Sequence, residues 1–260
     1  MKAGVSTSCL YPMPVEDALK CLVKAGISNT EIFLNTHSEL DESFIRKLKS
    51  TLESCNASCI SLHPFTCELD NMMFFSLYER RLDDALEYHK RYFNAMNILG
   101  SKIFVFHGNK NATPVSPEFY TERFNRLCLL GKSFGITVTH ENVARCQCRT
   151  LDYMQKLINL NPDIKFTLDI KQCLRAGENP FQIAEKIGGN IAHVHISDNS
   201  NENDCLKIGA GTFDISAFLS ILKLKGFDGS VIIELYRKNF NDINDLYNGF
   251  NIITERIDKI

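Results

Sequence analysis

The chain has 260 residues, 44% of them hydrophobic, and this length and composition suit one large α/β domain with a sizeable core. Its 29 basic and 31 acidic residues give a formal net charge of −2, so no excess positive field would attract nucleic acid or an anionic membrane. No apolar run approaches the roughly 20 residues that span a bilayer, and the amino terminus lacks the apolar core of a signal peptide. We therefore expect a cytoplasmic protein, whose ten cysteines stay reduced because they form neither a CxxC pair nor a regular series.

Short strand-like runs alternate with amphipathic helical patterns along the whole chain. The expected strands cover residues 2–7, 30–35, 58–63, 102–107, 136–141, 165–169, 192–197 and 230–236. Helical patterns follow them at residues 14–26, 41–55, 80–100, 116–135, 150–160, 179–188, 214–226 and 241–260. Eight strand–helix units without a linker or low-complexity tract predict a single-domain (β/α)8 TIM barrel formed by residues 1–260.

Four of the expected strands end on, or carry near their end, a side chain that can bind a metal. These residues are Glu141, Asp169, His195 and Glu234. In a parallel barrel the carboxyl ends of all strands lie on the same face. Ligands far apart in sequence can therefore meet there on a single divalent ion. Three carboxylates and one imidazole suit Mn, Mg, Co, Zn or Fe better than a thiolate site would.

This set of ligands suggests proton transfer next to a carbonyl group. An ion with open positions can bind neighbouring oxygens of a hydroxy ketone, acidify the C–H bond between them and stabilise the enediolate that forms. Glu141 and Glu234 are the candidates for catalytic acid and base, one removing the proton and the other returning it at the same or a neighbouring carbon.

The chain resembles the sugar phosphate isomerase/epimerase family of xylose-isomerase-like TIM barrels, which includes ketose 3-epimerases, hydroxypyruvate isomerase, inosose dehydratase and the apurinic-site endonucleases. The resemblance spans nearly the whole chain and is carried by Glu31 in TEIFLN, His63 in SLHPF, His107 in FVFHG, Glu141 and Asn142 in THENV, Asp169 in LDIKQ, His195 and Asp198 in HVHISDN, and Glu234 in IIELY. It implies that Glu141, Asp169, His195 and Glu234 bind one metal ion, and that the two glutamates also act as acid and base.

Departures from the family pattern bear on the choice between its branches. The endonucleases add two metals and need a histidine three residues after the metal-binding aspartate, where this chain has Gln172. They also need an Asp-x-His in a later loop, where this chain has Asn203 and Cys205, so we expect no third metal. The epimerases commonly place a substrate-binding histidine at the position of Gln172, so the substrate contacts differ from those of a typical ketose 3-epimerase.

Three residues of the resemblance are candidates for substrate contact. His63 and His107 end strands on the open face and could contact the substrate, bind a second metal together with Glu141, or only cap the barrel. Glu31 could contact the substrate or orient a metal ligand from behind. By strand alternation, His193 is expected to be a hydrogen-bonded core residue below His195, and His140 should face the helices.

Lys171 and Gln172 follow the aspartate Asp169 and are further candidates for substrate binding. Lys171 could bind a phosphate or carboxylate or polarise a carbonyl group; the alternatives are a solvated loop lysine and a lysine paired with Glu178. Gln172 could hydrogen-bond a hydroxyl group. Arg145 and Arg175 raise the same question for anion binding.

The sequence leaves several functions open. The first is a metal-dependent isomerase or epimerase of a small sugar, sugar phosphate or related polyol ketone, with a dehydratase of a keto-polyol as a close variant. The others are an endonuclease-like phosphodiesterase, which the near-neutral charge and missing ligands disfavour, and a barrel that binds sugar without turnover. The expected partner is a small-molecule sugar or sugar phosphate rather than nucleic acid or a membrane, and related barrels often form homo-oligomers.

Overall fold

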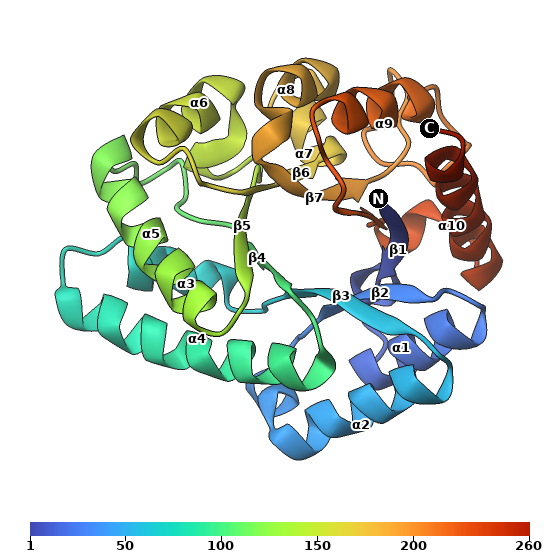
Figure 1. Cartoon of the computed structure of the whole chain (residues 1–260), viewed down its shortest axis with the longest axis horizontal. Helices are drawn as coiled ribbons and strands as arrows, with labels where there is room; N and C mark the ends of the chain where they lie inside the picture. The colour runs from blue at the N-terminus through green and yellow to red at the C-terminus, as the bar shows by residue number, and fades with distance from the viewer.

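Eight parallel strands close into a barrel in the order of the sequence, and helices cover its outside (Figure 1). The computed structural model describes residues 1–260. The strands are β1 (Lys2–Ser6), β2 (Asn29–Phe33), β3 (Ser58–His63), β4 (Ile103–Phe106), β5 (Thr137–Glu141), β6 (Phe166–Asp169), β7 (Ile191–Ile196) and β8 (Ser230–Ile233). The closing pair β1 and β8 is parallel, with Val5 opposite Ile233. The predicted (β/α)8 TIM barrel is thus confirmed.

The α-helices surround the strands on all sides. They are α1 (Val15–Lys24), α2 (Glu42–Ser54), α3 (Cys67–Phe74), α4 (Glu79–Leu99), α5 (Pro117–Ser133), α6 (Leu151–Leu160), α7 (Ile170–Arg175), α8 (Pro180–Ile187), α9 (Ile215–Leu224) and α10 (Ile243–Asp258). Short 3-10 helices lie at Thr7–Leu10, His37–Leu40, Gln147–Arg149, Gly188–Asn190 and Arg237–Asn239. None of these helices combines the length and the apolar character that a membrane-spanning segment requires.

Local signals in the sequence explain where several helices begin and end. Ser116 accepts a hydrogen bond from the Phe119 amide at the start of α5, where Pro117 occupies the first turn. Helix α4 ends at Gly100, whose φ of 81° suits a residue without a β-carbon. Asp169 caps α7 by accepting a hydrogen bond from the Gln172 amide. The last cap matters most here, because it joins a strand-end carboxylate directly to a helix.

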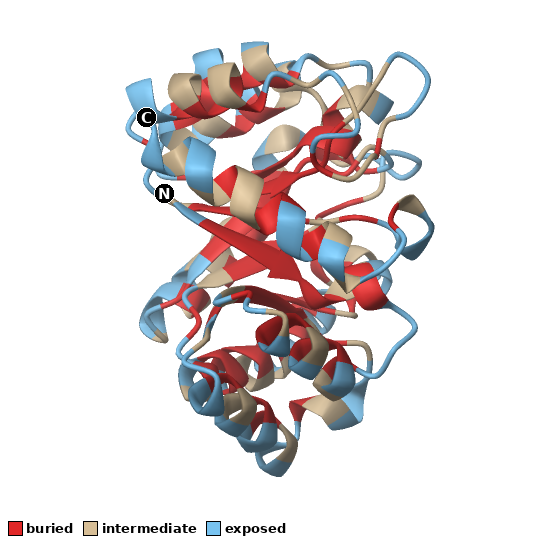
Figure 2. Cartoon of the chain, turned by 90° about the vertical axis from the view of Figure 1, so that its right-hand side faces the viewer, coloured by how far each residue is buried: buried red, intermediate tan, exposed pale blue.

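The hydrophobic core lies between the barrel and its helices and forms one cluster of 62 buried residues. Figure 2 shows the strands buried and the outward faces of the helices exposed. The inside of the barrel, by contrast, is polar: Glu31, Ser61, Thr139, Thr167 and His193 each have 0% exposure there. A polar interior needs internal hydrogen-bond partners, and the Thr139 and Thr167 hydroxyls meet at 2.7 Å.

Two register shifts align residues of the site. Between β2 and β3 the register shifts at Thr30 and Glu31, so that Glu31 pairs with Ser61. Between β6 and β7 it shifts at Phe166 and Thr167, so that Asp169 pairs with His195. Such irregularities re-aim side chains, and here each one sets a polar pair side by side.

Candidate active site

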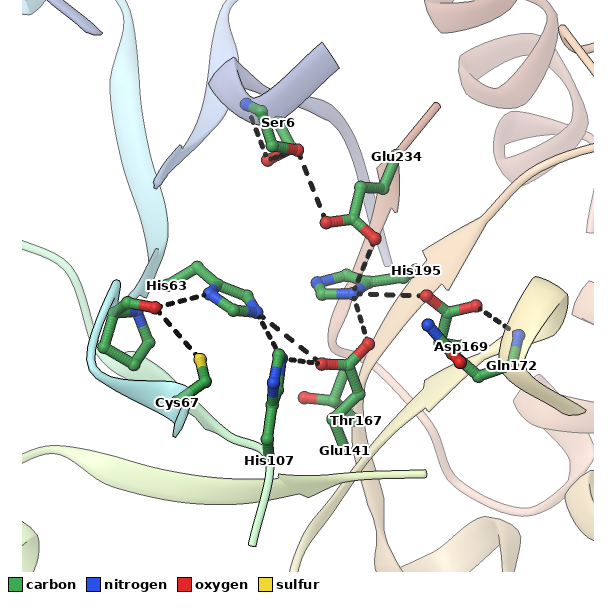
Figure 3. Close-up of polar contacts among 12 residues, drawn as sticks. Ser6, His63, Cys67, His107, Glu141, Thr167, Asp169, Gln172, His195 and Glu234 are labelled. Carbon is green, nitrogen blue, oxygen red and sulfur yellow. Dashed lines mark hydrogen bonds and ion pairs between the residues drawn. The ribbon is translucent and has the colours of Figure 1, made fainter. Parts of the chain in front are cut away.

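Four side chains from four strands converge at the carboxyl-terminal mouth of the barrel. Glu141 ends β5, Asp169 ends β6, His195 lies in β7 and Glu234 follows β8, and their ligand atoms all lie within 4.8 Å of one another. Nδ1 of His195 is 3.4 Å from Glu141 Oε1, 3.5 Å from Glu234 Oε2 and 3.8 Å from Asp169 Oδ2 (Figure 3). We call these four residues the carboxylate–histidine cluster. The sequence predicted them as metal ligands, and the fold brings all four together.

The chemistry of the carboxylate–histidine cluster fits a divalent cation. Nδ1 of His195 is buried without a hydrogen-bond partner, while Nε2 lies 3.1 Å from Glu31 Oε2. A proton on Nε2 would therefore leave the Nδ1 lone pair facing the three carboxylates, as a metal ligand requires. Burial raises the pKa of Asp169 to about 7, and the charges of Glu141 and Glu234 add to this rise against the effect of Lys171. Positive charge in the cluster would relieve that repulsion.

Lys171 supplies one such charge. Its ammonium contacts both Asp169 and Glu234, and only 5% of its side chain is exposed. Burial opposes the charged form, but Asp169 and Glu234 hold the pKa of Lys171 well above its ordinary value. Neither a solvated loop lysine nor a pair with Glu178 describes this residue. Helix α7, which begins at Ile170 and carries Lys171, was not predicted from the sequence; the available signal was Asp169, because aspartate commonly caps the start of a helix.

Glu31 lies beneath the carboxylate–histidine cluster rather than in its cavity. With 0% exposure, its Oε2 atom accepts from Ser61 Oγ at 2.8 Å and lies 3.2 Å from His193 Nε2 and 3.1 Å from His195 Nε2. Burial would raise the pKa of Glu31, but His195 and His193 hold it well below its usual range. Of the two roles considered for Glu31, this position favours the orientation of His195 over substrate contact, because the imidazole lies between Glu31 and the three carboxylates of the cluster.

His63 and His107 form a second histidine group on the other side of Glu141. Their Nε2 atoms are 2.8 Å apart, and His107 Nε2 lies 2.8 Å from Glu141 Oε2 (Figure 3). Burial lowers the pKa of His107, whereas the pKa of His63 is raised because hydrogen bonding and charge from Glu141 outweigh its burial. Both rings line the cavity, and together with Cys67 they could also hold an ion. Substrate contact and a second metal both remain compatible with this geometry.

A cavity of about 650 Å³ opens above the carboxylate–histidine cluster. Its floor includes Glu141, Glu234, Lys171 and Gln172, and its walls include the rings of Tyr11, Phe33, Phe65 and Tyr236. The sequence had not marked these aromatic residues, although each lies in or near a segment that follows a strand on the open face. The cavity combines a charged floor with apolar walls, as small-molecule sites commonly do.

The remaining polar candidates are tied to protein partners. Gln172 lines the cavity, but its Oε1 atom accepts from the Ala144 amide at 3.0 Å. Arg145 also lines the cavity, but it donates a hydrogen bond to Glu68 at 3.0 Å. Arg175 forms an ion pair with Asp204 and donates to the Tyr236 hydroxyl at 2.6 Å. Anion binding by either arginine would therefore require competition with a carboxylate.

Four further residues near the cluster have mainly structural contacts. Asn142 holds Asp169 through its backbone, accepting from the amide at 2.7 Å and donating to the carbonyl at 3.0 Å. His193 is buried beside Glu31 and His140 contacts Tyr120 of α5, in the positions that strand alternation predicted. Ser8, which the sequence did not single out, donates to Glu234 Oε1 at 3.3 Å.

Comparisons with known proteins agree with this architecture. The chain is 27% identical over 261 residues to the uncharacterized protein MJ1614 of Methanocaldococcus jannaschii, covering 94% of this chain and 96% of that protein. Among solved structures, a D-tagatose 3-epimerase-like protein superposes with a TM-score of 0.80 at 20% identity, covering 100% of this chain and 98% of the other. An L-ribulose 3-epimerase gives 0.79 at 14% identity, covering 100% and 95%. At such identities the likeness shows the fold. The model of the xylose isomerase-like TIM barrel family matches residues 19–255, and the chain belongs to that family.

Proposed function

We propose that this protein is a metal-dependent isomerase or epimerase of a small sugar, sugar phosphate or related polyol ketone. The observation that carries the proposal is the convergence of three carboxylates on the unpartnered Nδ1 of His195 at the floor of a cavity. Solved structures with this fold include proteins described as D-tagatose 3-epimerase-like and L-ribulose 3-epimerase, which supports a sugar as the class of substrate.

Glu141, Asp169, His195 and Glu234 would hold one divalent ion, with Mn, Mg, Co, Zn and Fe all compatible with their donor atoms. When bound, the ion supplies an electrophile for neighbouring oxygens of a hydroxy ketone. Although burial lowers it, Glu31 and Glu234 hold the pKa of His195 well above its ordinary value, so an incoming ion would replace the proton on Nδ1. Glu31, 3.1 Å from Nε2, would hold the proton that stays on that atom.

Glu141 and Glu234 then move the proton. One carboxylate removes a proton from the carbon next to the carbonyl, and the electron pair of that C–H bond forms the double bond of an enediolate. Return of a proton to the neighbouring carbon gives an isomer, and return to the opposite face of the same carbon gives an epimer. Both carboxylates start ionised, because His107 and Lys171 counteract burial and lower the pKa of Glu141 and of Glu234, respectively.

Contacts to the rest of the substrate would come from other residues that line the cavity. The rings of His63 and His107 and the side chains of Lys171 and Gln172 all line the cavity and can hydrogen-bond to hydroxyl or carbonyl oxygens. The aromatic walls can pack against the C–H faces of a sugar, so the cavity suits a small polyhydroxy ketone.

Hydrogen exchange with solvent tests the proposal. Protein supplied with Mn²⁺ or Co²⁺ in D₂O is incubated with a panel of free and phosphorylated ketoses, and NMR measures deuterium uptake at carbons next to the carbonyl. We expect uptake in the wild type, a loss of about 100-fold or more in Glu234→Gln with an unchanged fold, and wild-type uptake in Glu185→Gln on the exposed face of α8. Undiminished exchange in Glu234→Gln would contradict the acid–base assignment.

A further inference from the structure

Lys171 is the only lysine or arginine that pairs with a carboxylate of the carboxylate–histidine cluster. Its Nζ atom contacts Asp169 Oδ2 and Glu234 Oε2. The same two oxygens face Nδ1 of His195 at 3.8 and 3.5 Å. The ammonium therefore occupies oxygens that a metal ion in the cluster would use.

Backbone geometry and burial fix Lys171 in this place. It is the second residue of α7, whose start is set by the hydrogen bond from the Gln172 amide to Asp169 Oδ1 at 2.9 Å. A buried ammonium is costly unless it is paired, and only 5% of this side chain is exposed. The Tyr236 ring, which lines the same cavity, has its centroid 6.0 Å from Nζ, so it offers the ammonium no contact as close as those to the two carboxylates. The two carboxylates are thus what keeps the ammonium inside.

The charges also suggest how an ion and Lys171 would share the cluster. The ammonium of Lys171 already neutralises part of the negative charge on the three carboxylates, and it does so through the Asp169 and Glu234 oxygens that face Nδ1 of His195. Two cations on the same oxygen atoms repel each other strongly at low solvent exposure. Entry of a divalent ion would therefore push Nζ away from Asp169 and Glu234, and the lysine stem opens toward the cavity that it lines.

We propose that Lys171 determines the metal affinity of the cluster: its ammonium is a resident cation that a divalent ion must displace from Asp169 and Glu234. The displaced ammonium remains in the cavity wall, where it donates to an oxygen of the substrate. Because the proposal rests on the proposed function, metal binding by the cluster must be measured alongside the effect of Lys171.

Calorimetric titration of metal-stripped protein with Mn²⁺ separates the two questions. Lys171→Met, which removes the charge at similar length, should bind the ion about 10- to 100-fold more tightly than the wild type, the scale on which neighbours of ligands act. Metal-free Lys171→Met should also unfold at a lower temperature and gain more from added Mn²⁺. The control is Lys207→Met, which removes the lysine–carboxylate ion pair between Lys207 and Asp245, 2.7 Å long and outside the cavity. It should leave metal affinity unchanged.

Each outcome of the titration decides one question. Equal Mn²⁺ affinity in the wild type and Lys171→Met would overturn the role of Lys171 and leave the metal centre standing. No binding of Mn²⁺ or Co²⁺ by either protein would overturn the metal centre itself, and the inference with it.

A measurement on the wild type keeps the inference testable if the variant does not fold. Brief acetylation with and without saturating Mn²⁺, quantified by mass spectrometry, reports how accessible each lysine is. Lys171 should react several-fold faster when Mn²⁺ is bound, whereas Lys207 should react at the same rate in both samples. Unchanged or slower labelling of Lys171 in the metal-bound protein would overturn the displacement.

Discussion

Glu31 offers a sharp test of how the buried polar interior supports the candidate metal centre. Its Oε2 atom has contacts with Ser61 Oγ at 2.8 Å, His195 Nε2 at 3.1 Å and His193 Nε2 at 3.2 Å. In Glu31→Gln the side chain keeps its shape, but it loses its charge and turns an amide NH₂ toward one group of donors. The variant should therefore weaken both folding and the orientation of His195.

The magnitude follows from the number and kind of these contacts. Hydrogen bonds to a charged group contribute about 1.5–3 kcal/mol each, so the loss of one or two of them should lower the free energy of unfolding by about 1.5–6 kcal/mol. For a chain of this size, this corresponds to a fall in melting temperature of roughly 3–24 °C. Loss of the group that orients His195 should weaken Mn²⁺ binding by about 10- to 100-fold.

Thermal unfolding and calorimetric metal titration measure the two effects separately. Ser61→Ala is the matched control, because Ser61 contacts the same Glu31 oxygen but is not part of the carboxylate–histidine cluster. It should lower the free energy of unfolding by about 1.5–3 kcal/mol, the contribution of one hydrogen bond to a charged group, and leave Mn²⁺ affinity within about threefold of the wild type. If Glu31→Gln binds Mn²⁺ as tightly as the wild type, the orienting role of Glu31 is refuted.

Two further predictions concern stability away from the carboxylate–histidine cluster. At Gly108, with φ of 75°, a β-carbon would lie 1.9 Å from the Tyr120 hydroxyl oxygen, whereas at Gly177, with φ of 74°, it would meet nothing within 4 Å. Gly108→Ala should thus be less stable than Gly177→Ala by about 1–3 kcal/mol in urea unfolding, and equal losses would contradict the packing argument. Hydrogen bonding to Arg175 lowers the pKa of Asp204. This partly exposed pair therefore stabilises the fold fully when the pH is above the ordinary aspartate pKa near 3.9, and the contribution is lost as the pH falls through the lowered pKa. At pH 6 the free energy of unfolding of Asp204→Asn should be at most about 1 kcal/mol below that of the wild type. Between pH 5 and pH 3 it should fall less than that of the wild type, and identical profiles of unfolding free energy against pH would refute the assignment.

The barrel and the four residues of the carboxylate–histidine cluster were accessible from the sequence because each depends on local patterns. Runs of β-branched and aromatic residues alternate eight times with segments of helical periodicity. Eight such strand–helix units predict a parallel (β/α)8 barrel. Glu141 and Asp169 end their strands and Glu234 follows its own, so their convergence with His195 required only that the barrel close.

Features that depend on register or on non-local contacts were not accessible. Glu31 could be placed near the end of β2, but its position below His195 depends on the register shift between β2 and β3. No local sequence pattern predicts that shift. The pairing of Lys171 with Glu234 joins residues 63 positions apart. Helix α3, which places Cys67 beside His63 and His107, lies between residues 63 and 80, where the sequence predicted neither a strand nor a helix.

Metal stoichiometry tests the central claim most directly. Wild-type protein and a Glu141→Ala/Glu234→Ala double variant are equilibrated with Mn²⁺, Co²⁺ or Zn²⁺, passed through a desalting column and analysed by elemental mass spectrometry. The account predicts about one divalent ion per wild-type chain, because the four ligands form one site, and a loss of that ion in the double variant. No bound ion with any of the three metals, or equal occupancy in the double variant, would contradict it.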